Sequence, residues 1–125
     1  MNEEARKLFD GANHATLTSI NPDGGPQSTV VWVRTDGEDI LVSTVKGRRK
    51  PRNFERDPRA SILVIDPENP YRYAEVRGTV TMEDDPEGRL IEELSLKYTG
   101  TSWEEPPGNE RLIVRIHPRK VILRG

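Results

Sequence analysis

The sequence predicts a single, mainly β domain in which six or seven antiparallel strands combine with two or three short helices. The chain has 125 residues, which is the length of one ordinary domain. Hydrophobic residues are only 33% of the chain, but they gather in short runs typical of strands. Clusters of Asn, Asp, Gly and Pro separate these runs at short intervals, which indicates antiparallel connections.

The first part of the chain predicts one helix followed by three strands. We expect the helix over residues 3–10, ended by Gly11. Residues 15–20 alternate as a strand, and the turn at 21–25 leads into a second strand over 27–34. Asp36-Gly37 then closes a hairpin into a strand over 40–44, so a three-stranded meander is expected.

The middle of the chain predicts a short helix between two strands. Pro51 suits the first turn of a helix that ends near Arg56. Residues 62–65 are all apolar, which predicts a strand buried on both faces. Residues 73–82 alternate strictly, so we expect a long strand with one core face and one polar face. Gly78 within it marks a bend or a bulge.

The last part predicts a helix, a loop and two strands. Asp85 has the character of an N-cap and Pro86 that of the first helical residue. One face of this helix carries the apolar side chains of Leu90, Ile91, Leu94 and Tyr98, and Gly100 ends it. A loop over 101–109 follows, and the final strands, 112–116 and 121–123, are separated at Pro118.

The composition excludes several classes of function. The net charge is −2, so no general basic field attracts nucleic acid. The absence of cysteine excludes disulfides, thiolate metal sites and cysteine nucleophiles. His14 and His117 lack metal-ligand spacing, and no metal site is expected. No segment approaches a signal peptide or membrane span, so we expect a cytoplasmic protein without membrane contact.

The most informative segment lies between the third strand and the helix near Pro51. Ser43 and Thr44 end the strand, Gly47 allows a turn, and five cations follow or flank it: Lys46, Arg48, Arg49, Lys50 and Arg52. The N–H groups of a helix N-terminus attract anions, and arginine or lysine adds charge-assisted hydrogen bonds. Two interpretations stay open: a phosphate cradle, or a solvated basic turn that balances Glu55 and Asp57.

Other polar positions carry weaker signals. The polar face of the long strand, with Tyr73, Glu75 and Arg77, suits a ligand groove, a wetted surface or a subunit contact. Trp32 and Trp103 have the character of packing residues. No Ser-His-Asp set and no working pair of carboxylates is visible, so no catalytic residue is assigned.

Several motifs together resemble one known family. Residues 15–18 and 21–27, with Val31-Trp32, resemble the opening hairpin of the pyridoxamine 5'-phosphate oxidase-like flavin and deazaflavin oxidoreductases. The basic segment with Asn53 and residues 57–60 looks like the phosphate-binding turn of that family, 69–78 like its next strand, and 96–100 like its helix end. The resemblance spans nearly all of residues 1–125 and extends to the branch that uses coenzyme F420. It implies a split β-barrel of the FMN-binding type, in a single domain.

The resemblance also implies a cofactor site. Phosphate and tail would be held by Ser43, Thr44, Arg48, Arg49, Lys50 and Asn53. The ring would lie beside the second strand, at Gln27, Ser28, Thr29, Val30 and Trp32. Tyr73 and Arg77 would act across a homodimer interface that contains the cofactor sites. The oxidase proper has an Arg and a Lys where this chain has Ser28 or Thr29 and Val33, which argues against the vitamin B6 reaction.

Three functions follow as hypotheses. The first is an F420-dependent reductase that passes hydride to a small organic acceptor. The second keeps the class with FMN as cofactor, although the excess of cations favours a longer anionic tail. The third is a module that binds a flavin, a deazaflavin or a tetrapyrrole without catalysis.

Overall fold

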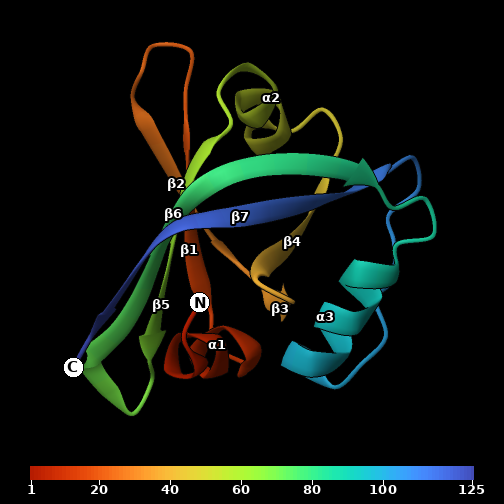
Figure 1. Ribbon diagram of the computed structural model, residues 1–125. Helices are drawn as coiled ribbons and strands as arrows, with labels where there is room; N and C mark the ends of the chain where they lie inside the picture. The colour runs from red at the N-terminus through yellow and green to blue at the C-terminus, as the bar shows by residue number, and fades with distance from the viewer.

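The computed structural model describes residues 1–125 as one curved seven-stranded sheet with three helices (Figure 1). The strands follow the order β2-β1-β5-β6-β7-β4-β3, and every neighbouring pair is antiparallel. In chain order the elements are α1 (Glu3–Asp10), β1 (Ala15–Ile20), β2 (Pro26–Val31), β3 (Arg34–Asp36), β4 (Asp39–Val45), α2 (Arg49–Arg56), β5 (Arg59–Asp66), β6 (Asn69–Asp84), α3 (Arg89–Thr99) and β7 (Arg111–Arg124). The mainly β prediction is confirmed.

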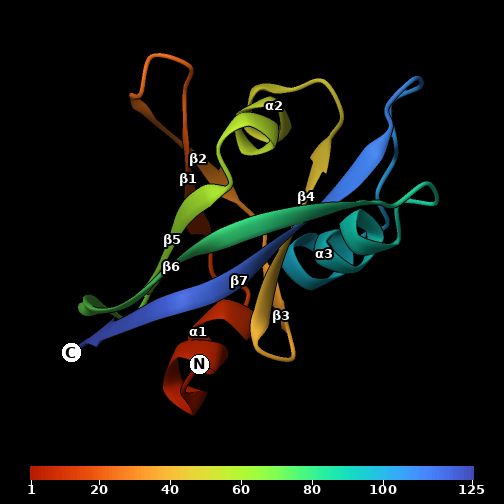
Figure 2. The same ribbon diagram turned by 45° about the horizontal axis from the view of Figure 1, so that its top comes forward.

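One apolar core fills the curve of the sheet. It contains 18 buried residues, and α1 contributes Ala5, Leu8 and Phe9 to it. β6 contributes Ala74, Val76 and Val80, which are the alternate positions expected to face inward. A second small cluster attaches α3 to β4 through Leu41, Leu90 and Leu94. Figure 2 shows α3 beside the end of β7 that lies opposite the C-terminus.

The predicted meander is wrong, because the first four strands lie at the two ends of the sheet order. β1 pairs with β2 and β5, whereas β4 pairs with β3 and β7. The expected strand over 27–34 is therefore two strands, broken at Trp32 and Val33. Val33 is fully buried, and its N–H donates to the Tyr98 hydroxyl at 3.1 Å instead of to a strand. This bond to α3 holds the chain where it leaves β2 for the opposite edge of the sheet.

Three further expectations need correction. β5 is buried on one face only, because its register turns Ile65 outward, where 46% of the residue is exposed. α2 begins at Arg49, two residues before Pro51, which still lies in its first turn. α3 begins at Arg89, since Gly88 adopts a left-handed φ of +62° after a turn. Asp85 still caps α3, because its carboxylate accepts the Arg89 and Leu90 N–H groups at 3.1 and 3.0 Å.

The two expected C-terminal strands are one strand, because Pro118 lies at a β-bulge. Gly78 faces Pro118 and Arg77 faces Lys120, which leaves Arg119 as the extra residue. Proline is tolerated at bulges, and Pro118 also lies beyond Ile116, the last β7 residue paired with β4. The shift of register between Arg77 and Gly78 confirms the bulge expected at Gly78, and a Cβ on Gly78 would lie 2.1 Å from the His117 carbonyl oxygen. None of the three helices is long and apolar enough to cross a membrane.

Candidate functional site

A cavity of about 210 Å³ opens where β2, the end of β4, the start of α2 and α3 meet. We call it the β4–α2 cavity; it is lined by His14, Val30, Val31, Trp32, Ser43, Thr44, Arg48, Lys50, Ile91 and Leu94. Two cations line it and no carboxylate does. The structure thus brings together the predicted site residues Val30, Trp32, Ser43, Thr44, Arg48 and Lys50.

The local backbone makes one end of the cavity electropositive. Gly47 adopts a φ of +90°, a left-handed conformation that glycine reaches without strain, and the chain turns from β4 into α2 there. Arg48 is the N-cap of α2 but forms no side-chain capping bond, and the first turn contains no acidic residue. The first N–H groups of the helix therefore keep their capacity to bind an anion.

Several side chains at this end have hydrogen-bond donors that an anion could pair with. Lys50 Nζ donates to Thr29 Oγ1 at 2.9 Å, which brings Thr29 to the edge of the site. Burial lowers the pKa of the Lys50 ammonium, and the nearby Arg48 charge lowers it further. The Ser43 hydroxyl oxygen is buried without a hydrogen-bond partner. Because buried polar groups are nearly always paired, this hydroxyl fits a ligand rich in acceptor oxygens.

The opposite end of the cavity is aromatic and apolar. Trp32 stacks on Tyr98 with ring centroids 5.4 Å apart and 12° between the planes. Trp103 meets Trp32 edge to face at 6.1 Å, and His14 meets Tyr98 at 5.4 Å. Burial raises the pKa of the Tyr98 hydroxyl, which donates to the Asn13 carbonyl at 2.8 Å. Trp32 therefore packs against other rings, as its type suggested, and also lines the cavity.

The remaining predicted residues of this region face elsewhere. Gln27 and Arg49 line a separate hollow of about 340 Å³ beside the β1–β2 turn. Asn53 is fully buried, and its amide donates to Ser19 Oγ at 2.9 Å and Asn21 Oδ1 at 3.1 Å. Those bonds tie α2 to the hairpin. Ser28 lies on the outer face of the sheet, where its hydroxyl pairs with that of Thr18 at 2.8 Å.

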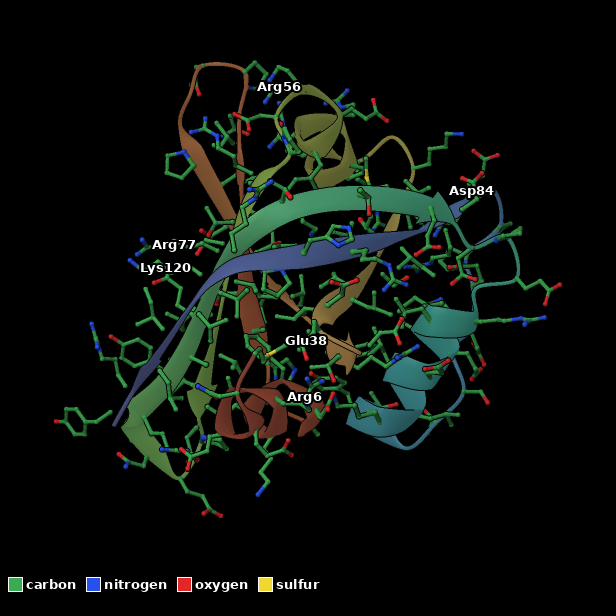
Figure 3. The ribbon with its side chains drawn as sticks, viewed as in Figure 1. Arg6, Glu38, Arg56, Arg77, Asp84 and Lys120 are labelled. Atoms are coloured by element: carbon green, nitrogen blue, oxygen red, sulfur yellow. The ribbon has the colours of Figure 1, made fainter.

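Tyr73 and Arg77 lie on β6, outside the β4–α2 cavity. Glu75 holds the Arg77 guanidinium, with Nε and Oε2 3.1 Å apart. Figure 3 shows Arg77 and Lys120 projecting next to each other from β6 and β7, far from α3. Arg77 joins Arg59 and Arg119 around a shallow depression of about 600 Å³ with no carboxylate in its lining, which we call the arginine hollow.

Three lining residues were not expected from the sequence. His14 stands alone before β1, and Ile91 and Leu94 belong to an ordinary apolar helix face. No local pattern distinguishes them from surface and core residues. Ile91 and Leu94 reach the cavity because α3 packs against β4, and His14 contacts Tyr98 of the same helix.

Comparison with known proteins agrees with this architecture. The family model described as pyridoxamine 5'-phosphate oxidase matches residues 1–125. A solved structure described as an F420 reductase is 34% identical, with 98% of each chain covered and a TM-score of 0.88. A conserved hypothetical protein from Mycobacterium tuberculosis is 28% identical, with 99% of this chain and 84% of the other covered and a TM-score of 0.81.

The same fold recurs in the General Stress Protein 26 from Bacillus anthracis, at 21% identity. That match covers 98% of this chain and 92% of the other, with a TM-score of 0.76. The curved antiparallel sheet, whose edge strands β2 and β3 do not pair with each other, is a split β-barrel. The chain belongs to the pyridoxamine 5'-phosphate oxidase family.

Proposed function

We propose that the protein is an F420-dependent reductase, which binds a deazaflavin and transfers hydride from it to a small organic acceptor. The observation that carries this proposal is the β4–α2 cavity, with a cationic helix N-terminus at one end and an aromatic wall at the other. Family membership and the 34% identity to an F420 reductase support an oxidoreductase with a flavin-type cofactor.

Each end of the cavity has a distinct part in binding. Arg48, Lys50 and the first N–H groups of α2 would bind the cofactor phosphate. The unpaired Ser43 hydroxyl would supply a further hydrogen bond, and Trp32 would orient the ring. The bound cofactor supplies the hydride, while the protein supplies binding, orientation and exclusion of water.

One chain provides only part of such a site. The cavity holds about 210 Å³, less than the roughly 300–1,000 Å³ of ordinary ligand pockets. A second wall is available on the outer face of the sheet, where the register aligns Val30, Thr16, Leu63 and Glu75 across four strands. Val30 is 69% exposed and belongs to both the cavity and this face.

We therefore propose a homodimer in which this outer face of each copy covers the cavity of the other. A two-fold axis gives two equivalent sites, each built from both chains. Tyr73 and Arg77 would reach the cofactor from the second copy, which explains why neither lines the cavity of its own chain.

The arginine hollow favours F420 over FMN within this proposal. Three guanidinium groups surround it, and Arg119 forms no ion pair, unlike Arg59 and Arg77. An oligoglutamate tail offers carboxylates for such a surface, whereas FMN ends at its phosphate. Arg119→Ala should weaken binding of the tailed deazaflavin and leave its tail-free analogue unaffected.

The decisive experiment purifies the protein from a host that makes both cofactors and identifies the bound one by its absorption spectrum. Titration with F420 and FMN and anaerobic turnover with a panel of acceptors complete it. We expect tighter binding of F420 and oxidation of its reduced form. Preference for FMN would contradict the cofactor assignment, and binding without turnover of any acceptor would indicate a storage or shielding protein.

A further inference from the structure

The connection between α3 and β7, residues 100–110, has no regular structure, but side-chain contacts fix it at Trp103. Glu105 accepts hydrogen bonds from Trp103 Nε1 at 2.9 Å and from Arg111 Nε at 2.7 Å. The Trp103 backbone N–H donates to Glu92 Oε1 at 3.1 Å. Arg111 is buried, and its guanidinium lies 5.1 Å from the centre of the Trp103 ring. Both the backbone and the ring of Trp103 are therefore fixed.

The ring held in this way rests against Trp32. Trp32 lies in the break between β2 and β3, so no strand ladder orients it. Two aromatic neighbours do so instead: Tyr98 stacks on Trp32, and Trp103 meets it at 87°. Tyr98 is itself anchored through its hydroxyl to the Asn13 carbonyl and the Val33 N–H.

Trp103 does not line the β4–α2 cavity, and no other residue of 100–110 does. Its effect on the site must therefore pass through Trp32. We infer that Trp103 is a positioning residue for the cofactor ring, held against Trp32 by Glu105 and Arg111. The expected effect on cofactor affinity rests on the proposed function, but the packing of Trp32 can be measured without any cofactor.

The test compares Trp103→Ala with Trp103→Phe. The chain contains two tryptophans, so each variant leaves Trp32 as the only tryptophan to report by fluorescence. With alanine we expect lower fluorescence anisotropy and stronger acrylamide quenching of Trp32 than with phenylalanine, because a ring at position 103 still supports it. F420 affinity should fall by about threefold to tenfold in Trp103→Ala, the worth of one aromatic pair, and should largely recover in Trp103→Phe.

Two controls separate positioning from general damage. Leu96→Ala, made together with Trp103→Phe so that Trp32 stays the only tryptophan, removes an exposed apolar side chain of α3 outside the cavity and should change neither readout. The affinity for inorganic phosphate should be equal in all variants, because Arg48 and Lys50 form that end of the site. If Trp103→Ala does not fold, Glu105→Gln loosens the same contact and should lower F420 affinity while the affinity for inorganic phosphate stays unchanged.

The outcomes keep this inference distinct from the proposed function. Equal anisotropy and quenching of Trp32 in the alanine and phenylalanine variants would overturn the positioning role. So would unchanged F420 affinity in Trp103→Ala, or an equal loss for F420 and phosphate. If the wild-type protein binds neither F420 nor FMN, the proposed function fails, while the Trp32 fluorescence still decides the positioning.

Discussion

Lys50→Ala gives the sharpest test of the anion end of the cavity. Lys50 is half-buried, and its Nζ has one polar partner, Thr29 Oγ1 at 2.9 Å. A hydrogen bond to a charged group is worth about 1.5–3 kcal/mol, or about tenfold to 150-fold in Kd. Partial burial keeps the interaction from being screened to the roughly 0–1 kcal/mol of an exposed ion pair. We therefore expect Lys50→Ala to raise the Kd for the cofactor by about tenfold to 150-fold.

Calorimetric titration with FMN and riboflavin measures this effect, because the two ligands differ only in the phosphate. F420 without its glutamate residues and the phosphate-free deazaflavin form a second pair. Lys50→Ala should weaken binding of the phosphorylated member of each pair and leave the other nearly unchanged. Arg49→Ala is the control: it removes the same charge from the neighbouring residue, whose side chain faces the separate hollow. Equal losses in both variants, or equal losses for both ligands, would refute the assignment of Lys50 to the phosphate.

Four further predictions follow from particular contacts. Wild-type protein should sediment as a dimer of twice 14.2 kDa, and Arg77→Glu should favour the monomer and weaken cofactor binding, whereas Arg89→Glu on α3 should do neither. The Arg111 guanidinium, with Trp103 and Asn109, holds the pKa of Glu105 at about 2, below the ordinary value of 4.5. The ionised Glu105 carboxylate therefore stabilises the fold fully above about pH 4.5, and this stabilisation disappears as the pH falls toward 2. Glu105→Gln should accordingly lower the free energy of unfolding by about 1 kcal/mol near pH 7, after allowance for solvent screening, and by nothing near pH 2 in denaturant titrations. Gly78→Ala should lower the free energy of unfolding, measured in thermal melts, by about 3 kcal/mol or more, because the alanine Cβ would collide with the His117 carbonyl oxygen. Asn53→Ala should cost about 1–3 kcal/mol of stability and leave the Lys50-dependent phosphate affinity unchanged; a selective loss of phosphate affinity would instead place Asn53 in the site.

Local periodicity was sufficient to predict the bounds and the buried face of an element that packs on the one apolar core. The bounds of α1 and β1 agree with the expectation from the sequence, and the inward face of β6 is the expected one. Alternation with period two reports which side chains face an apolar interior, and it does so without reference to other strands. The bulge at Gly78 was also visible, because a glycine in a long strand marks a close approach of another backbone.

Strand order was not visible, because periodicity describes a face and carries no information about which strand pairs with which. The break at Trp32 and Val33 depends on Tyr98, 65 residues further along the chain, which binds the Val33 N–H. The resemblance alone made Asn53 a cofactor ligand, and its place in the chain does not show that the turn of α2 directs its amide to Ser19.

The two ends of the candidate site illustrate the division between sequence and tertiary structure. The sequence alone determined that Ser43, Thr44, Arg48 and Lys50 lie together at the cationic end, since they are close in the chain and a strand followed by a glycine turn and a helix brings them together. Only the tertiary structure decided the aromatic end, which joins Trp32 to His14, Ile91 and Leu94. Ile91 and Leu94 reach it because α3 is buried on β4, and His14 and Trp32 join them through contacts with Tyr98 of that helix. Burial is a property of two surfaces that no single segment contains.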